Sequence, residues 1–212
     1  MRNKFLKINI LLISVALFMA CGNNKTERLT SPDGKIAVTF SLSDGKPSYS
    51  VQKNGKDVIA ASKLGFKLNL EDSLCSGFKI IDVSVDSLNE TWQQPWGEEI
   101  EVRNHYNGLK ISLQENSGKQ RLLNIVFRAF DEGVGFCYEF PEQQNLHEFE
   151  IADELTEFAL VADDSARTIP AYKGEYYEVI WKKQPVSKSD TVTTPVTIET
   201  SGGGFILLHE AK

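Results

Sequence analysis

The chain has 212 residues, of which 41% are hydrophobic and 10% aromatic, enough for a sizeable core in one domain, or in one domain plus a fragment. Its formal net charge is −6 and it contains no basic tract, so nucleic acid is not expected as a partner. Its three histidines, His105, His147 and His209, lie far apart in the sequence and form no metal-binding motif with the cysteines.

Residues 1–21 have the pattern of a targeting segment. They open with three basic residues, Arg2, Lys4 and Lys7. The apolar run at 8–19 is too short to span a membrane, and it is followed by Ala20 and Cys21. This pattern predicts a signal peptide of the lipoprotein type, whose cleavage would leave Cys21 to carry lipid, and plain secretion with cleavage nearby is the alternative. We therefore expect export to the periplasm or outer cell surface, with an anchor in the membrane.

Residues 22–28 are polar and are expected to form a short tether, so that the folded domain covers 29–212. Two further cysteines, Cys75 and Cys137, show no paired spacing. We expect two free thiols, with Cys137 packed inside an apolar strand as a small hydrophobic residue.

From Leu29 onward, apolar side chains alternate with polar or small ones, which is typical of β-strands. The pair Asn54-Gly55 between two such runs is a strong hairpin signal. Strands are expected around the apolar residues of 36–40, 49–53, 58–60, 64–70, 78–85, 109–113, 122–129 and 134–140. The one weak helix candidate, 152–160, fits a strand equally well. The sequence predicts an all-β fold, a large antiparallel sandwich of two large sheets.

The stretch 91–106 combines aromatic and charged residues at close spacing. Trp92 and Trp96 each carry a large apolar surface with one N–H group. They are accompanied by the polar residues Glu98, Glu99, Glu101, Arg103, Asn104 and His105. This combination suits a corner buried under a domain interface, or a surface that faces a sugar. The alternative is a hydrophobic corner followed by an ordinary solvated strand.

The segment 127–136 predicts a strand, a tight turn around 131–133 and a second strand. Arg128 falls within the first of these apolar strands. Because a buried charge is costly unless it is paired, we expect a structural arginine with Glu139 as its partner.

The C-terminal part contains a second aromatic stretch, 169–181, with Glu175, Glu178 and Trp181. The polar residues 182–195 are expected to be an exposed connection. The continuous apolar run 205–208 predicts a buried strand. The glycines before it are followed by neither a helix start nor a Lys-Ser/Thr pair, so a phosphate loop is not expected. A chain that ends on a buried strand suggests that further polypeptide belongs after it.

Several of these stretches together resemble the N-terminal domain of glycoside hydrolase family 97. They are 29–34, 91–107, 127–141, 169–172 and 209–211, in this order. The resemblance covers nearly everything after the signal. It implies a β-super-sandwich of the galactose-mutarotase-like type, which in full-length members precedes a catalytic (β/α)8 barrel. Because the barrel holds the catalytic carboxylates, we assign no catalytic residue here and expect this chain, truncated before the barrel, to be inactive alone.

The resemblance also implies ligands and partners. Family members are exported, calcium-dependent α-glucosidases and α-galactosidases, and most of their calcium ligands lie in the barrel. One ligand resembles a glutamate after the Ile-Pro pair, which is Glu178 here, with Glu175 as the alternative. A carboxylate is a suitable calcium ligand. The implied partners are the barrel, in cis or as a separate chain, and an α-glucoside or α-galactoside.

The sequence departs from the family pattern at three positions. Thr168 replaces a common tryptophan, Cys137 a common arginine, and Gly108 a frequent acid. Two further functions therefore remain open. One is a stand-alone sugar-binding lipoprotein that stacks sugars on Trp92, Trp96 and Trp181, and the other is a structural remnant of a split gene. Buried indoles favour the structural role, whereas a row of exposed indoles favours sugar binding.

Overall fold

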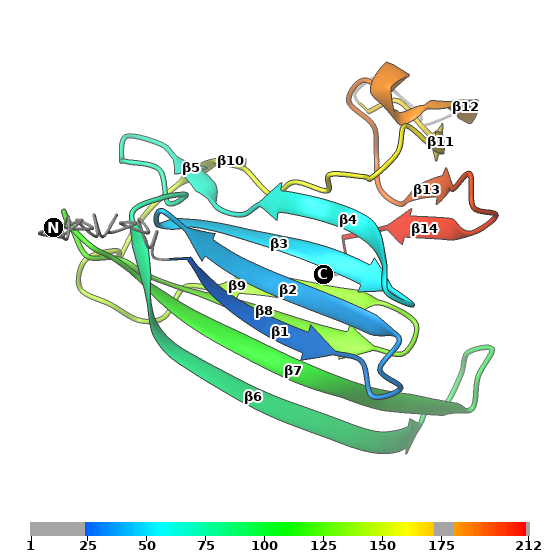
Figure 1. Ribbon diagram of the computed structural model, residues 1–212, viewed down its shortest axis with the longest axis horizontal. Helices are drawn as coiled ribbons and strands as arrows, with labels where there is room; N and C mark the ends of the chain where they lie inside the picture. The colour runs from blue at the N-terminus through cyan, green and yellow to red at the C-terminus, as the bar shows by residue number, and fades with distance from the viewer. Residues whose placement is uncertain (1–23, 172–179, 211–212) are drawn as a thin grey trace, which may run out of the picture.

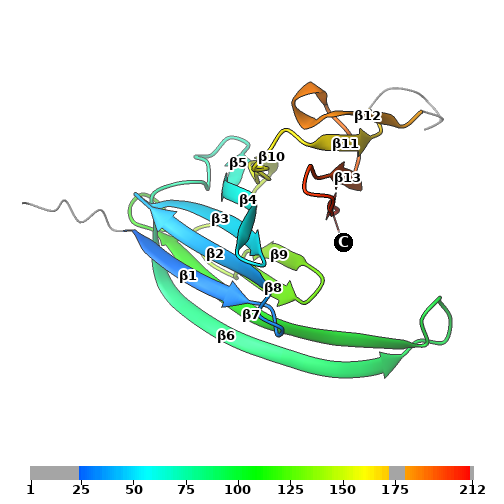
Figure 2. The same cartoon turned by 45° about the vertical axis from the view of Figure 1, so that its right-hand side comes forward.

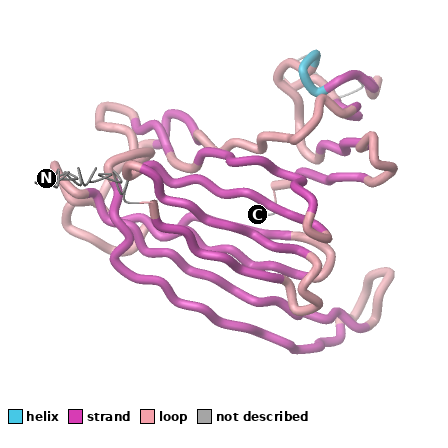
Figure 3. Tube along the Cα trace, in the orientation of Figure 1, coloured by secondary structure: helices cyan, strands magenta, loops and turns pink. Residues whose placement is uncertain are grey.

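The computed structural model describes residues 24–171 and 180–210, and in these ranges it is built almost wholly from antiparallel β-strands. Figure 3 shows that the only helical element in this part of the chain is the 3-10 turn η1 (Val186–Lys188). No helix among the described residues has the length and apolarity needed to cross a bilayer. The expected all-β fold is confirmed.

The first sheet is a four-stranded meander in the order β1-β2-β3-β4. Its strands are β1 (Lys25–Thr30), β2 (Ile36–Ser43), β3 (Lys46–Lys53) and β4 (Lys56–Lys63). The turn between β3 and β4 is the predicted Asn54-Gly55 pair, and both residues have positive φ, 51° and 72°, as a two-residue hairpin turn of type I′ requires. β1 begins at Lys25 and so includes the last four residues of the stretch that we expected to be tether.

The second sheet has the order β6-β7-β8-β9. Its strands are β6 (Phe78–Gln93), β7 (Glu101–Glu115), β8 (Leu122–Phe130) and β9 (Val134–Glu139). β6 and β7 pair with each other over their whole length, but β8 accompanies β7 only as far as Tyr106. The outer halves of β6 and β7 therefore continue beyond the sheet as a two-stranded ribbon (Figure 1).

The hydrophobic core lies between these two sheets. Alternate side chains of each strand point inward, as the period-two pattern predicted. Fully buried members are Val38 and Phe40 of β2, Ile111 and Leu113 of β7, and Ile125 and Phe127 of β8. Burying each such side chain stabilises the fold by about 1.5–3 kcal/mol. The two sheets form the predicted antiparallel sandwich.

A small two-stranded sheet, β5 (Phe66–Leu68) with β10 (Ile151–Glu154), lies at one end of the sandwich. Phe66 packs against the rings of Tyr138 and Phe140, with centroid distances of 4.5 and 5.3 Å. The chain after β10 runs beside β4, where Ala60 N–H donates to the carbonyl of Ala159. The weak helix candidate at 152–160 is therefore a strand followed by extended chain.

A third sheet, in the order β12-β11-β13-β14, follows the sandwich in sequence. Its strands are β11 (Ser165–Thr168), β12 (Lys182–Pro185), β13 (Val196–Glu199) and β14 (Phe205–Leu208). Two expectations are corrected here. The stretch 182–195 contains β12 and η1 and is not only a connection. β14 is an exposed edge strand, with Phe205 70% and Leu207 63% exposed, because in the described part of the chain it has a strand neighbour only on the side of β13.

Two smaller expectations about the second sheet are also corrected. Cys75 and Cys137 are both free, but Cys137 is exposed, because the neighbouring positions 136 and 138 of β9 face inward. Arg128 is exposed on the outer face of β8 and lies over the ring of Tyr106, 4.7 Å from its centroid. Glu139 instead forms an ion pair with Lys110 at 2.7 Å.

The buried arginine of the sandwich is Arg121, whose side chain is 2% exposed. Its guanidinium donates to Glu115 through Nε and Nη2, at 2.8 and 2.6 Å. Its Nη1 donates to Glu71 at 3.3 Å and to the carbonyl of Asp72 at 2.9 Å. The buried charge is thus fully compensated, which is the condition under which a charge can be buried at modest cost.

Candidate functional site

The candidate site is the projecting part of the β6–β7 hairpin, residues 88–106, which we call the arm. Its base is the pair Leu88 and Tyr106, the last position at which β8 accompanies β7. The loop at its tip is closed by two bonds from Gln94, one from N–H to the carbonyl of Ile100 at 3.1 Å and one from Nε2 to the carbonyl of Glu99 at 2.6 Å. Figure 2 shows the arm extending past the first sheet.

The tip of the arm exposes large apolar side chains. Trp96 is 84% exposed, Ile100 71% and Trp92 48%. Four exposed acids accompany them, Glu90, Glu98, Glu99 and Glu101. The stretch is therefore not a buried corner of this chain. It is an apolar tip within an acidic surrounding, and apolar groups that are exposed together in this way are a common feature of interaction surfaces.

The polar residues predicted for the site divide between the two faces of the ribbon. Arg103 and His105 share one face, where Arg103 Nε donates to Asn89 Oδ1 at 3.2 Å. Asn104 points to the opposite face and donates through Nδ2 to Glu90 Oε1 at 3.0 Å. Because side chains alternate along a strand, these three residues cannot contact one ligand atom together.

His105 has one further feature. Its Nδ1 atom is buried and has no hydrogen-bond partner among the described residues. Its position opposite Asn89 places it in the polar row along one face of the arm. An imidazole Nδ1 can donate or accept one hydrogen bond, depending on the tautomer, and here it does neither with a described residue.

The base of the arm is anchored to the sandwich. The ring of Tyr106 packs on Phe130 at 5.4 Å between centroids, and Asn107 Nδ2 donates to the carbonyl of Thr30 at 2.9 Å. A side chain at Gly108 would collide with the carboxylate of Asp86. The space over Gly108, where an acid is frequent in the resembled family, is thus already occupied by an acid from the neighbouring strand.

The remaining predicted residues lie elsewhere. Trp181 is 54% exposed and precedes β12 in the third sheet, which is well separated from the arm in Figures 1 and 2. The three tryptophans therefore do not form one row. Glu175, Glu178 and Cys21 lie outside the described residues. Within 24–171 and 180–210, no three side chains of His, Cys, Asp or Glu come together as a metal-binding group.

Sequence reasoning missed two exposed apolar residues, Ile100 and Ile180. Ile100 follows two acids and precedes a third, and Ile180 is 86% exposed beside Trp181. An isolated isoleucine among acids was the available signal at the tip. This signal does not by itself indicate an exposed tip, because a single apolar residue in a loop is compatible with ordinary packing.

The family model described as "Glycosyl-hydrolase 97 N-terminal" matches residues 29–212. The chain belongs to this family. The solved structures agree with the assignment. A glycoside hydrolase family 97 enzyme from Pseudoalteromonas sp. strain K8, solved in complex with panose and with acarbose, is 37% identical with a TM-score of 0.84. The match covers 88% of this chain and 28% of that one.

Two more distant relatives extend the comparison. A β-arabinopyranosidase structure matches this family 97 N-terminal chain with 26% identity and a TM-score of 0.76, over 85% of this chain and 31% of that one. A retaining α-galactosidase of Bacteroides thetaiotaomicron is 25% identical over 97% of this chain and 31% of its own length. The chain therefore spans about a third of the length of the relatives it matches.

Proposed function

We propose that this chain is the N-terminal accessory domain of a family 97 α-glycosidase and that the arm binds to the catalytic domain. The observation that carries the proposal is the apolar tip, with Trp96 84% exposed on a ribbon without further cover among the described residues. An isolated two-stranded ribbon is marginally stable in water. A ribbon that displays two indoles and an isoleucine is best explained by a protein surface that covers them.

The energetics are consistent with such a contact. Tryptophan is enriched among the residues that dominate the affinity of protein interfaces. Burying one large apolar side chain contributes about 1.5–3 kcal/mol before the costs of association. The exposed acids Glu98, Glu99 and Glu101 would surround the contact, so the facing surface of the catalytic domain should carry lysine or arginine at its rim.

A chimera tests the proposal. Residues 24–210 replace the matched N-terminal region of the Pseudoalteromonas enzyme, and hydrolysis is measured with panose, the sugar bound in that relative. We expect an active enzyme. In the same chimera, Trp96→Ala should lower the temperature at which half of the activity is lost. Leu70→Ala removes another large apolar side chain that is 97% exposed but lies outside the arm, and it should have no effect.

An inactive chimera that is nevertheless folded would contradict the accessory role. Equal thermal inactivation of the Trp96→Ala and Leu70→Ala chimeras would show that the accessory domain does not contact its partner through the arm. The two variants are matched because each removes an exposed side chain without opening a cavity in the core.

Carbohydrate binding by the chain itself is the second candidate function. It is favoured by the exposure of Trp92 and Trp96, and by the position of Trp92 on the same face of the ribbon as Asn104 and Glu90. Calorimetric titration with panose is the test, with Trp96→Ala as the variant. Heat of binding that disappears in the variant would support a sugar surface, and no heat at millimolar sugar would exclude it for panose.

Calcium is proposed only at a site that this chain shares with the catalytic domain. On the family resemblance, Glu178, or Glu175 in its place, contributes one carboxylate to a site completed by the catalytic domain. Calcium takes six to eight oxygen ligands, and the described residues form no metal-binding group of their own. The chain alone should therefore bind calcium weakly and hydrolyse no aryl α-glucoside or α-galactoside. In the chimera, Glu178→Gln should weaken calcium binding measured by calorimetry. Tight, salt-resistant binding by the chain alone would contradict a shared site.

The targeting segment gives the proposed location. Cleavage before Cys21 and lipidation of that residue would anchor the protein at the periplasmic or outer cell surface. Cys21→Ala should move the protein from the membrane fraction to the soluble fraction of cells that express the full sequence. An unchanged membrane fraction would contradict lipoprotein processing.

A further inference from the structure

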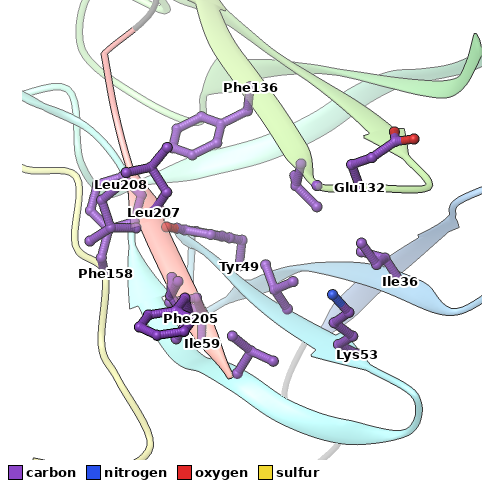
Figure 4. Close-up of a pocket in the computed structure, with 15 residues that line it drawn as sticks. Ile36, Tyr49, Lys53, Ile59, Glu132, Phe136, Phe158, Phe205, Leu207 and Leu208 are labelled. Atoms are coloured by element: carbon purple, nitrogen blue, oxygen red, sulfur yellow. The ribbon is translucent and has the colours of Figure 1, made fainter. Parts of the chain in front are cut away.

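A cavity of about 310 Å³ lies between β14 and the sandwich (Figure 4). The third sheet contributes all four residues of β14 to its lining. The sandwich contributes aromatic side chains from three separate segments, Tyr49, Phe136 and Phe158. The size and apolar character are those of a ligand site. What distinguishes this cavity is the backbone that borders it.

One border of the cavity is the free edge of β14. Thr200 N–H donates to the carbonyl of Gly204 at 2.8 Å, which fixes the alternation of bonds along the β13–β14 ladder. In an antiparallel pair every second residue bonds across the ladder, and the residues between point their N–H and C=O groups away. Phe205 and Leu207 are the residues that point away. Both line the cavity.

The opposite border is the free edge of β9. Phe130 N–H donates to the carbonyl of Gly133 at 2.8 Å, so Gly135 and Cys137 bond to β8. The N–H and C=O groups of Val134 and Phe136 therefore point outward, and both residues also line the cavity. β9 and β14 are the outermost strands of the second and third sheets. Within 24–171 and 180–210, two strand edges whose outward backbone groups have no partner strand thus border one apolar cavity.

We propose that this cavity receives an extended β-strand that pairs with the edge of β14 and approaches the edge of β9, and that the strand comes from the part of a family 97 polypeptide that lies beyond its N-terminal region. Strand addition at an open edge supplies main-chain hydrogen bonds, while pockets along the edge select alternate side chains. Such a strand would connect the second and third sheets. An exposed apolar edge strand without a cover would otherwise favour aggregation.

Three arguments favour a strand from the further polypeptide as the occupant of the cavity. A round apolar ligand would fill the cavity but leave the outward backbone groups of Phe205, Leu207 and Phe136 unpaired, whereas a strand can pair with them. The relatives are about three times as long as this chain, so each carries a long further polypeptide in cis. The described chain also leaves β14 at Leu208, on the border of the cavity (Figure 4).

The residues that line the cavity also restrict the sequence of the strand. Lys53 and Glu132 line it at the end away from Phe158 and Leu208 (Figure 4). A strand fits this lining if its apolar residues alternate where it passes Tyr49, Phe136 and Phe158. Its charged residues should be confined to the end near Lys53 and Glu132. This inference rests on the proposed function only for the origin of the strand.

Fluorescent peptides of twelve residues provide the test. They tile the sixty residues that follow the matched region in the Pseudoalteromonas enzyme, and binding to the full chain is measured by fluorescence anisotropy. We expect one or two neighbouring peptides to bind. The bound peptide should slow amide hydrogen exchange at Phe205 and Leu207 of β14 and at Phe136 of β9.

Two proline variants provide the matched comparison. Leu207→Pro removes an outward N–H from the edge of β14 without breaking a bond to β13. Val85→Pro does the same at the free edge of β6, because the bond from Gln94 N–H to the Ile100 carbonyl places Val85 at an outward position. Val85 is 76% exposed and is not one of the residues that line the cavity. We expect Leu207→Pro to weaken peptide binding at least tenfold and Val85→Pro to leave it unchanged.

Three outcomes would overturn the proposal. They are the absence of binding by any peptide at 1 mM, equal weakening by both proline variants, and self-association of the chain through β14, which would make a second copy the occupant. An active chimera with no peptide binding would reject this inference alone. Peptide binding with an inactive chimera would reject the accessory function and retain the strand site.

Discussion

The two halves of the β6–β7 hairpin share one continuous ladder but have opposite surroundings. In the inner half, Leu109, Ile111 and Leu113 of β7 are at most 2% exposed, beneath the first sheet. In the outer half, the arm exposes Trp92, Trp96 and Ile100 to solvent. Strand pairing is therefore common to both halves, and the cover supplied by other elements is what differs. The inner half of β7 contributes buried side chains to the core, whereas the apolar side chains of the arm are exposed and free to make the contact proposed above.

The largest expected effect comes from an identical substitution in the two halves. Ile111→Ala removes a fully buried side chain and should lower the free energy of unfolding by about 2–5 kcal/mol. Ile100→Ala removes the same atoms from a side chain that is 71% exposed and should stay within about 0.5 kcal/mol of the parent. Urea unfolding followed by circular dichroism measures both. Similar losses of unfolding free energy in the two variants would contradict the difference in burial between the inner and outer halves of the hairpin.

A second pair of variants compares the two ends of β7. Glu115 accepts bonds from the buried Arg121, whereas Glu101 is exposed at the arm. Glu115→Gln keeps the size but removes the charge that faces the guanidinium. It should cost about 1–3 kcal/mol of unfolding free energy, because Glu71 still pairs with Arg121. Glu101→Gln should leave stability unchanged, and a measurable loss there would indicate an unrecognised role for the arm in folding.

The same carboxyl predicts a pH dependence. Burial acts to raise the pKa of Glu115, but the hydrogen bonds and charge of Arg121 outweigh it and hold the pKa below its ordinary value. A lowered folded-state pKa contributes stability above the ordinary value of about 4.3, and this stability is lost as the pH falls through the folded-state pKa. The parent should therefore lose stability more steeply below about pH 4.3 than Glu115→Gln, as measured by unfolding at several pH values. If the free energies of unfolding of the two proteins fell in parallel as the pH decreased, this assignment would be contradicted.

Trp96→Ala should also have only a small effect on stability. The indole is 84% exposed, so its removal opens no cavity, and the free energy of unfolding should change by less than about 0.5 kcal/mol. Thermal unfolding of the full chain is the measurement. A large loss of unfolding free energy would show that the tryptophan packs within this chain, so that it is not available for contact with a partner.

The core could be predicted from the sequence because its signals are local. Alternation at Val38 and Phe40, and the turn at Asn54-Gly55, depend on neighbouring residues only. The exposure of β14 depends on which strands flank it, and an apolar run of four residues carries no such information. The ion pairs of Arg121 join residues up to fifty positions apart.

The candidate site was predicted in part. The density of aromatic and charged residues located the arm, but its exposure follows from the end of β8 at Phe130, which leaves β7 without its second neighbour. The alternation of Arg103, Asn104 and His105 between faces follows from strand geometry and could have been derived once the ribbon was known. The separation of the third sheet, whose strand β12 directly follows Trp181, from the arm is a property of tertiary structure alone.

Amide hydrogen exchange along the β6–β7 hairpin tests the central claim most directly, by comparing the full chain with the chimera that carries the Pseudoalteromonas catalytic region. The outward amides of the arm, such as those of Asn89 and Thr91, have no strand neighbour among the described residues. We predict that exchange of the arm slows in the chimera, while exchange of the inner half at Leu109–Leu113 stays the same. Equal exchange of the arm in both proteins would contradict docking through this surface.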